Sequence, residues 1–147
     1  MFKIIAFDMD GTLADTIPMC IQAFRESVSP YTGHRLSEEE ILRTFGLNET
    51  GMVKAVAGSN WEAALEDFYM RYEALHKEVT RTFPGISDLL LFLKERKHVL
   101  ALITGKGAKC CAISLKKLGL SETFDDVLCG SEQAPNKTEN MEYLLQK

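Results

Sequence analysis

Acidic and hydroxyl side chains follow two apolar stretches of the sequence, at the points where those stretches end. Asp8 and Asp10 come just after residues 2–7, and Thr104 comes just after residues 99–103. A carboxylate at the tip of a strand is well placed to attack phosphorus and form an acyl phosphate. A second acid two residues later can protonate a leaving oxygen and afterwards activate water. These residue types at these points therefore suit phosphoryl-group chemistry.

Other groups near the same stretches suit a phosphate and a cation. Two neighbouring carboxylates favour Mg²⁺, which prefers oxygen ligands and leaves positions to water and substrate phosphate. Thr104 offers a hydroxyl, and Gly105 lets backbone N–H groups approach a phosphate closely. A lysine such as Lys137 could hold the charges of a nucleophile and of phosphoryl oxygens together. Taken singly, Asp-Gly and Thr-Gly pairs are ordinary turn sequences, so the prediction depends on their combination.

The elements that must bring these residues together are strands and helices in alternation. Short apolar runs rich in β-forming residues predict strands at 2–7, 99–103 and 127–129. Apolar residues at helical spacing predict helices at 15–29, 38–45, 49–56, 61–79, 86–96, 109–118 and 137–146. Ser37 and Asn60 are expected to cap two of these helices, and Gly119 to end another. The alternation predicts an α/β fold with a parallel sheet of about three strands, whose carboxyl edge binds the ligand.

The helices between residues 15 and 81 have no predicted strand among them. They indicate an all-helical subdomain inserted after the first strand. Residues 1–14 and 82–147 are then expected to form the sheet-containing core. The stiff turn at residues 83–85 marks the return of the chain to that core.

The composition argues against several classes of protein. The chain has 147 residues, of which 46% are hydrophobic and 26% are charged, and its net charge is −4. These values suit one folded unit with a core of its own and disfavour a disordered chain. No apolar run approaches the roughly 20 residues that a bilayer requires. The mildly acidic balance disfavours nucleic acid and anionic membranes as partners, and we expect a cytoplasmic protein.

Three stretches of the sequence together resemble the motifs of the haloacid dehalogenase (HAD) superfamily. Residues 7–13, FDMDGTL, are similar to its first motif, hydrophobic-Asp-x-Asp-Gly-Thr. Residues 102–106, LITGK, resemble the second motif, a strand that ends in Thr or Ser, and Lys137 resembles the third-motif lysine. The turn at 83–85 and the helical insert resemble the phosphoglycolate phosphatase-like branch. The resemblance spans essentially the whole chain and implies a Rossmann-like core with a helical cap that closes over the site.

The resemblance also implies a role for each matching residue. Asp8 would be the nucleophile that becomes aspartyl-phosphate, and Asp10 would be the general acid and base. Mg²⁺ would bind the Asp8 carboxylate and the Asp10 main-chain carbonyl, and Lys137 would stabilise Asp8. The residues expected to bind the transferring phosphoryl group are Gly11, Thr12, Thr104 and Gly105, and those expected to contact the substrate's leaving group are Thr16, Gly46 and Lys106.

The sequence also departs from the family pattern. The fourth motif, an acidic pair after a further strand that completes the Mg²⁺ site, has no counterpart before Lys147. Without the strands that flank it in the family's sheet, the strand before Asp8 is expected to lie at an edge, where it could pair with another chain. In the third motif, Lys137-Thr138 stands where many relatives have Lys-Pro.

The leading expectation is therefore an HAD-like phosphatase that hydrolyses a small phosphomonoester, of the phosphoglycolate or sugar-phosphate type, with Mg²⁺. Its partner would be a small phosphorylated metabolite. Three alternatives stay open: a truncated or degenerate relative that binds phosphate without turnover, a phosphomutase of the same fold, and a phospho-accepting signalling domain. The helical insert directly after the first strand counts against the signalling domain.

Overall fold

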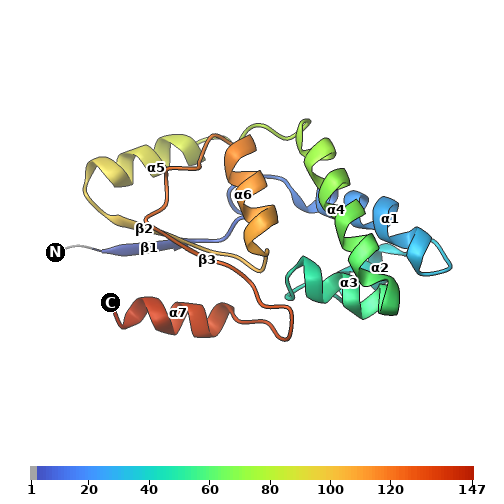
Figure 1. Ribbon diagram of the computed structural model, residues 1–147. Coiled ribbons are helices and arrows are strands. Elements are labelled where there is room, and N and C mark those ends of the chain that lie inside the picture. The colour runs from blue at the N-terminus through green and yellow to red at the C-terminus, as the bar shows by residue number, and fades with distance from the viewer. Residues whose placement is uncertain (1–2) are drawn as a thin grey trace.

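Three parallel strands form one sheet in the computed structural model, which describes residues 3–147 (Figure 1). Their order is β1 (Ile4–Phe7), β2 (Val99–Ile103) and β3 (Asp126–Leu128), so that β1 lies at an edge. Ile4 pairs with Val99, and Ala101 pairs with Asp126. The predicted parallel α/β sheet is confirmed. Phe2, which the sequence assigns to the first strand, lies outside the described residues.

The two faces of β2 are covered by different helices, because successive side chains of a strand point to opposite faces. The helices that pack on the sheet are α5 (Ile86–Glu95), α6 (Ala108–Lys117) and α7 (Lys137–Leu145). Leu100 and Leu102 share a buried cluster with residues of α5 and α6. Ile103 shares another with Leu144 of α7. The result is a layered core with α5 and α6 on one side of the sheet and α7 on the other (Figure 1).

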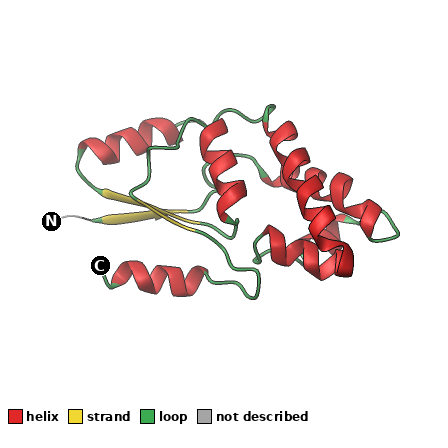
Figure 2. Cartoon of the chain, in the orientation of Figure 1, coloured by secondary structure: helices red, strands yellow, loops and turns green. Residues whose placement is uncertain are grey.

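The segment between β1 and α5 is helical (Figure 2). Its helices share a hydrophobic cluster that is separate from the clusters on the sheet. Its α-helices are α1 (Ile17–Val28), α2 (Glu38–Leu42), α3 (Glu49–Ala57) and α4 (Trp61–His76), with short 3₁₀ turns at Ser29–Tyr31 and Gly58–Asn60. Phe24 of α1 and Phe68 of α4 stack edge to face, with ring centroids 5.7 Å apart. Cys110 of α6 also belongs to this cluster, so the insert packs against the core. We call residues 15–81 the cap; these bounds stay a prediction.

Local signals at the helix ends agree with the structure in most cases. Ser37 and Glu40 form the predicted capping box at the start of α2, each side chain accepting from the other's backbone N–H at 3.1 Å. Gly119 has a φ of +71° after α6, as expected of a residue that ends a helix. Asn60 stands at the predicted N-cap position of α4, but its side chain makes no capping hydrogen bond, because a 3₁₀ turn leads directly into the helix.

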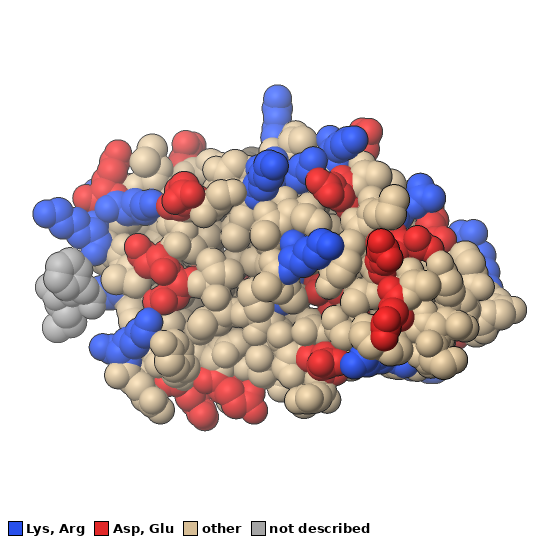
Figure 3. Space-filling model, in the orientation of Figure 1, with Lys and Arg blue, Asp and Glu red and all other residues tan. Residues whose placement is uncertain are grey.

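The surface carries charges of both signs. Figure 3 shows acidic and basic side chains interspersed over the visible face of the molecule. Within residues 3–147, no helix has the length and apolar character needed to cross a membrane.

Candidate active site

Asp8 and Lys137 meet at the carboxyl edge of the sheet. Asp8 directly follows β1, and Lys137 is the first residue of α7. The Lys137 Nζ atom lies 2.9 Å from Asp8 Oδ2, and the backbone N–H of Met9 donates to Asp8 Oδ1 at 2.7 Å. Met9 is fully buried, which fixes the backbone on which Asp8 stands. The carboxylate is therefore oriented by an amide on one oxygen and by a cation on the other.

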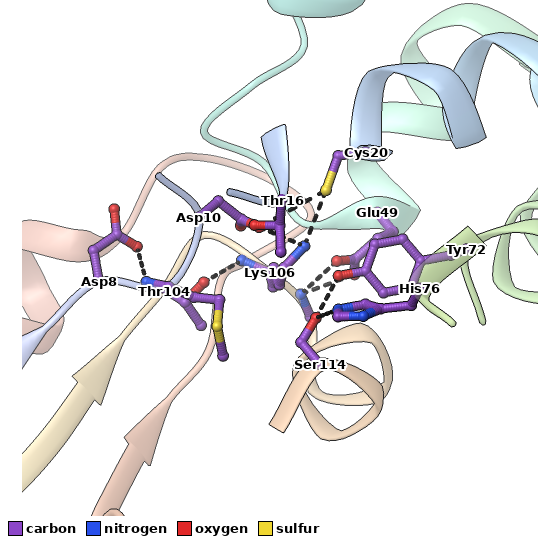
Figure 4. Close-up of polar contacts among 12 residues, drawn as sticks. Asp8, Asp10, Thr16, Cys20, Glu49, Tyr72, His76, Thr104, Lys106 and Ser114 are labelled. Atoms are coloured by element: carbon purple, nitrogen blue, oxygen red, sulfur yellow. Dashed lines mark hydrogen bonds and ion pairs between the residues drawn. The ribbon is translucent and has the colours of Figure 1, made fainter. Parts of the chain in front are cut away.

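Asp10 is held by donors from three other segments (Figure 4). Its Oδ1 atom accepts a hydrogen bond from the Thr16 hydroxyl, and Lys106 Nζ lies 3.2 Å from the same atom. The Cys20 thiol is also directed at Asp10 Oδ1, at 3.8 Å. All these contacts fall on Oδ1, and Oδ2 receives none from the residues that the structure describes. Gly11, with a φ of +75°, supplies the tight turn that brings the chain from Asp10 back toward α1.

Hydrogen bonds tie the turn after β2 to the core. Thr104 is fully buried, and its hydroxyl accepts from the backbone N–H of Lys106 at 3.1 Å. The loop after β3 supports the turn from behind, because the Gly130 N–H donates to the Lys106 carbonyl at 2.7 Å. A Cβ atom on Gly130 would overlap the backbone of Gly105, so the two loops touch where only glycine fits. The turn therefore presents Gly105 and Lys106 in one fixed arrangement.

These residues line a pocket of about 300 Å³ between the core and the cap. Of the residues predicted from the sequence, Asp8, Asp10, Gly46, Gly105, Lys106 and Lys137 line it. Its other lining residues are Ile17, Cys20, Phe45 and Leu47, all from the cap. The charged residues of the lining thus belong to the core, and the cap contributes mainly apolar ones.

Four predicted residues do not line this pocket. Thr16, expected to contact the leaving group, is fully buried and bonds to Asp10, so the structure gives it a supporting position. Thr104 is likewise enclosed, since its hydroxyl is turned into the Lys106 backbone. Gly11 and Thr12, expected to bind phosphate, are exposed on the turn after Asp10. The turn bends away from the pocket because the Gly11 N–H bonds to the Ala14 carbonyl at 2.9 Å.

Sequence reasoning did not identify several residues that support the site. Two of them, Cys20 and Tyr72, contact the predicted residue Lys106, which is almost fully buried: its Nζ lies 3.3 Å from Cys20 Sγ and 4.6 Å from the centre of the Tyr72 ring. Burial raises the pKa of Cys20 to about 11, so that this thiol is neutral near pH 7. The carboxylate of Glu49, 5% exposed, accepts from the backbone N–H of Gly107. These partners come from different elements, and local periodicity carries no signal for such contacts.

A series of buried, hydrogen-bonded side chains extends from the site into the interface between cap and core (Figure 4). The hydroxyls of Tyr72 and Ser114 hydrogen-bond, and Ser114 Oγ lies 2.9 Å from His76 Nε2. His76 Nδ1 lies 2.9 Å from the carbonyl oxygen of Val79 and must donate to it, because a carbonyl can only accept. Nε2 is then an acceptor for Ser114. Burial lowers the pKa of His76, which favours this neutral form.

The donors available to a cation are oxygens. Within the part of the chain that the structure describes, no three His, Cys, Asp or Glu side chains gather into a group able to hold a metal ion. Mg²⁺ does not require such a cage: one or two protein oxygens suffice when water and a substrate phosphate complete its shell. The carboxylate of Asp8, 38% exposed and facing the pocket, fits that kind of site.

Comparison with known proteins gives a consistent set of similarities. The sequence profile of the haloacid dehalogenase-like hydrolases matches residues 5–147. A phosphorylated carbohydrates phosphatase from Thermotoga maritima is 30% identical over 96% of this chain and 67% of its own length. A phosphoglycolate phosphatase from Haemophilus influenzae is 25% identical over 88% of this chain. The chain spans only 63% of that protein and 58% of the Caldanaerobacter subterraneus relative that it also matches.

Solved structures show the same fold. CbbY from Rhodobacter sphaeroides, in complex with phosphate, superposes with a TM-score of 0.78 and covers 100% of this chain at 22% identity; the match takes in 74% of CbbY. A haloacid dehalogenase-like family protein from Streptococcus pneumoniae has a TM-score of 0.68, with 99% of this chain and 69% of that one covered at 25% identity. At the identity of the CbbY match, the likeness shows the architecture alone.

Proposed function

The chain belongs to the haloacid dehalogenase-like hydrolase family, and on that basis we propose that it is a phosphatase that hydrolyses a small phosphomonoester through a phosphorylated Asp8. The observation that carries the proposal is the Asp8 carboxylate, which faces the pocket with Lys137 Nζ 2.9 Å from one of its oxygens. A nucleophile whose orientation is set before the substrate arrives needs less reorganisation at the moment of attack. The phosphatases among the relatives support this assignment.

In the first half of the reaction, an oxygen of Asp8 attacks phosphorus and the bond from phosphorus to the leaving oxygen breaks. Asp10 donates a proton to that oxygen, so the product leaves as an alcohol. Oδ2 is the Asp10 atom suited to this transfer, since the contacts to Asp10 fall on Oδ1. In the second half, Asp10 takes a proton from water as the water attacks phosphorus. The bond between phosphorus and the Asp8 oxygen breaks, inorganic phosphate leaves, and both carboxyl groups return to their initial states.

Lysine side chains assist both halves of this reaction. Lys137 balances the charge of Asp8 and would contact the phosphoryl oxygens as the acyl phosphate forms. Lys106, 3.2 Å from Asp10 Oδ1, balances the negative charge that Asp10 carries after it has donated its proton. Thr104 contributes indirectly, because its hydroxyl accepts from the Lys106 N–H and so fixes the turn that carries Gly105 and Lys106.

Mg²⁺ would be held by the Asp8 carboxylate and the main-chain carbonyl of Asp10. When bound, it would neutralise part of the charge on the phosphoryl group. The donor set in the pocket is of the hard-oxygen type that this ion prefers.

The size and lining of the pocket support a small substrate. About 300 Å³ is the lower end of the range for ligand pockets. The cap residues Ile17, Phe45 and Leu47 add apolar walls to the pocket, which help to keep water away from the reacting groups. We therefore place the substrate among phosphomonoesters of small metabolites, with phosphoglycolate and sugar phosphates as the first candidates.

The test is Mg²⁺-dependent release of phosphate from p-nitrophenyl phosphate, phosphoglycolate and a panel of sugar phosphates. We expect turnover that stops with a chelator and is lost in Asp8→Asn. Retention of activity in Asp8→Asn would contradict the proposal. Binding of inorganic phosphate without release from any ester would favour a silent relative. Movement of phosphate between sugar positions, followed by ³¹P NMR, would favour a phosphomutase.

A further inference from the structure

A buried carboxylate of the cap rests on the first turn of a core helix. Glu49 begins α3, and its two carboxylate oxygens lie 3.1 and 2.8 Å from the backbone N of Gly107, the residue before α6. Burial, together with the nearby Glu49 carboxylate, raises the pKa of the Cys110 thiol, one turn into α6. Only 5% of the Glu49 surface is exposed. Figure 4 shows this carboxylate directed at the helix end beside Lys106.

The charge of Glu49 is balanced by the helix end. No ion pair joins Glu49 to a lysine, arginine or histidine among residues 3–147. The first N–H groups of a helix lack partners within the helix and carry a partial positive charge, which stabilises an anion. Burial of a carboxylate costs free energy unless hydrogen bonds compensate it, so each of its few partners matters for its stability. Glu49 is therefore stable in this place only while the cap lies against α6.

The start of α3 docks on the core over a wider contact. The backbone N–H of Asn48 donates to the Ser131 carbonyl at 2.9 Å, and Lys54 pairs with Glu132 at 2.7 Å. Gly51 lies so close to the Glu132 backbone that a Cβ atom would overlap it. Glu49 is thus the buried centre of an interface between one end of a cap helix and the two loops that follow β2 and β3.

The turn at 104–107 is held from both ends, once by the core and once by the cap. Its first residue, Thr104, donates its N–H to the Leu128 carbonyl of β3 at 3.0 Å. Its last residue, Gly107, donates to Glu49. Between them lie Gly105 and Lys106, which line the pocket. A shift of Gly107 would be passed to Lys106 through one peptide bond.

We propose that Glu49 is a positioning residue for the phosphatase reaction. Its carboxylate binds the start of α6, sets the 104–107 turn and so holds Lys106 against Asp10. The assignment rests on the proposed function. It makes proton transfer by Asp10 depend on the contact between Glu49 of α3 and the start of α6.

The contact is tested first by hydrogen exchange, which does not require turnover. In Glu49→Ala the Gly107 amide loses its acceptor, and its exchange is expected to become at least about tenfold faster. The matched control is Glu62→Ala, which removes an exposed glutamate from the first turn of α4. It should leave Gly107 exchange unchanged. Equal exchange of Gly107 in Glu49→Ala and in the wild type would overturn the proposal.

A second variant disturbs the contact from the core side. Gly107 has a φ of −73°, which alanine adopts freely, but its Cβ atom would overlap Glu49 Oε2 and displace the carboxylate. Gly107→Ala should therefore reproduce the kinetic effect of Glu49→Ala. The double variant should be little worse than either single variant, because both remove one contact. Additive losses would show that the two residues act separately and would contradict the proposal.

A comparison of kcat on two esters distinguishes a positioning role of Glu49 from a general loss of protein stability. An alkyl phosphate needs a proton on its leaving oxygen, whereas p-nitrophenolate leaves without one. Glu49→Ala should lower kcat for the alkyl ester about tenfold and change kcat for p-nitrophenyl phosphate less than twofold. Equal losses on both substrates would assign Glu49 a merely structural role and overturn the inference. If the wild type turns over no ester, the proposed function fails, while the exchange experiment still decides whether Glu49 holds the turn.

Discussion

Asp8 and Lys137 lie 2.9 Å apart although 129 positions separate them in the sequence. Both side chains are partly exposed, with 38% and 51% of their surfaces accessible. Exposed ion pairs contribute little to folding, about 0–1 kcal/mol, so stability alone gives little reason to bring these two residues together. Their meeting at the carboxyl edge of a parallel sheet, on the wall of a pocket, agrees with a role in chemistry.

Lys137→Met is expected to reduce kcat at least about a hundredfold, because a cation that stabilises the charge of the phosphoryl transition state is lost. Its free energy of unfolding should change by less than about 1 kcal/mol. The control is Lys147→Met, which breaks a similar pair with Asp126 away from the pocket. Equal kcat values for the wild type and Lys137→Met would show that the pair has no catalytic role.

Lys106→Met is expected to reduce stability as well as activity. Lys106 is 7% exposed and Asp10 is 23% exposed, so loss of the lysine leaves a largely enclosed carboxylate without its cation. Removal of one partner of a buried pair destabilises a protein by about 3 kcal/mol. Urea unfolding of Lys106→Met and of the double variant with Asp10→Asn measures this, and the double variant should recover part of the loss. A single variant as stable as the wild type would contradict the role given to this pair.

Much of the site could be predicted because its residues stand beside boundaries that local sequence reveals. Asp8 and Asp10 follow a short apolar strand, Thr104 follows another, and Lys137 begins a helix. In a parallel sheet these boundaries lie at one edge, so the meeting of Asp8 and Lys137 follows from topology.

The rest of the site depends on how the cap docks, which local periodicity does not encode. In the sequence, Glu49 is an ordinary acid in the first turn of a helix. Only the structure shows that it accepts from the Gly107 N–H. Thr16 was expected to face the substrate, but the turn through Gly11 directs its hydroxyl at Asp10. Tyr72 fits the apolar stripe of its helix, and only the fold brings Lys106 over its ring.

His76 is expected to make stability fall as the solution becomes mildly acidic. Burial lowers its pKa in the folded protein below the ordinary value of 6.5. As pH falls through that value, the unfolded chain takes up a proton that the folded chain excludes, so the free energy of unfolding decreases. Above the ordinary pKa, neutral His76 makes its full contribution to the free energy of unfolding. This contribution is lost as the pH falls toward the lowered pKa of the folded protein. The slope of this free energy between about pH 5 and pH 7 should therefore be smaller in His76→Gln.

His34 provides a contrast of opposite sign. Its hydrogen bond with Glu40 raises its pKa, so it stabilises the folded state below the ordinary value and loses this effect as pH rises through the raised pKa. His34→Gln should make the same slope larger. A change in the same direction for both variants would contradict the assignment of His76 as a buried neutral acceptor.

Gly130→Ala is expected to displace the 104–107 turn. Its Cβ atom would overlap the backbone of Gly105, so one of the two loops must move. Such overpacking costs about 1–3 kcal/mol of stability, and a shift of the turn should reduce kcat/KM about a hundredfold. Gly105→Ala is the control for stability, because its Cβ atom would lie 3.9 Å from the Gly46 carbonyl oxygen, an ordinary contact. Thermal unfolding of the two variants should differ; equal melting temperatures would contradict close packing of the loops.

The most direct test of the account is to trap the acyl phosphate. The protein is mixed with a phosphomonoester and Mg²⁺, quenched and reduced with borohydride, which converts an aspartyl-phosphate to homoserine. Mass spectrometry of the peptide that contains residues 7–13 then reports the site. We predict homoserine at position 8, dependent on ester and Mg²⁺ and reduced in amount by Lys137→Met. Turnover of the ester with position 8 unmodified, or homoserine at another aspartate, would contradict the role of Asp8 as the nucleophile.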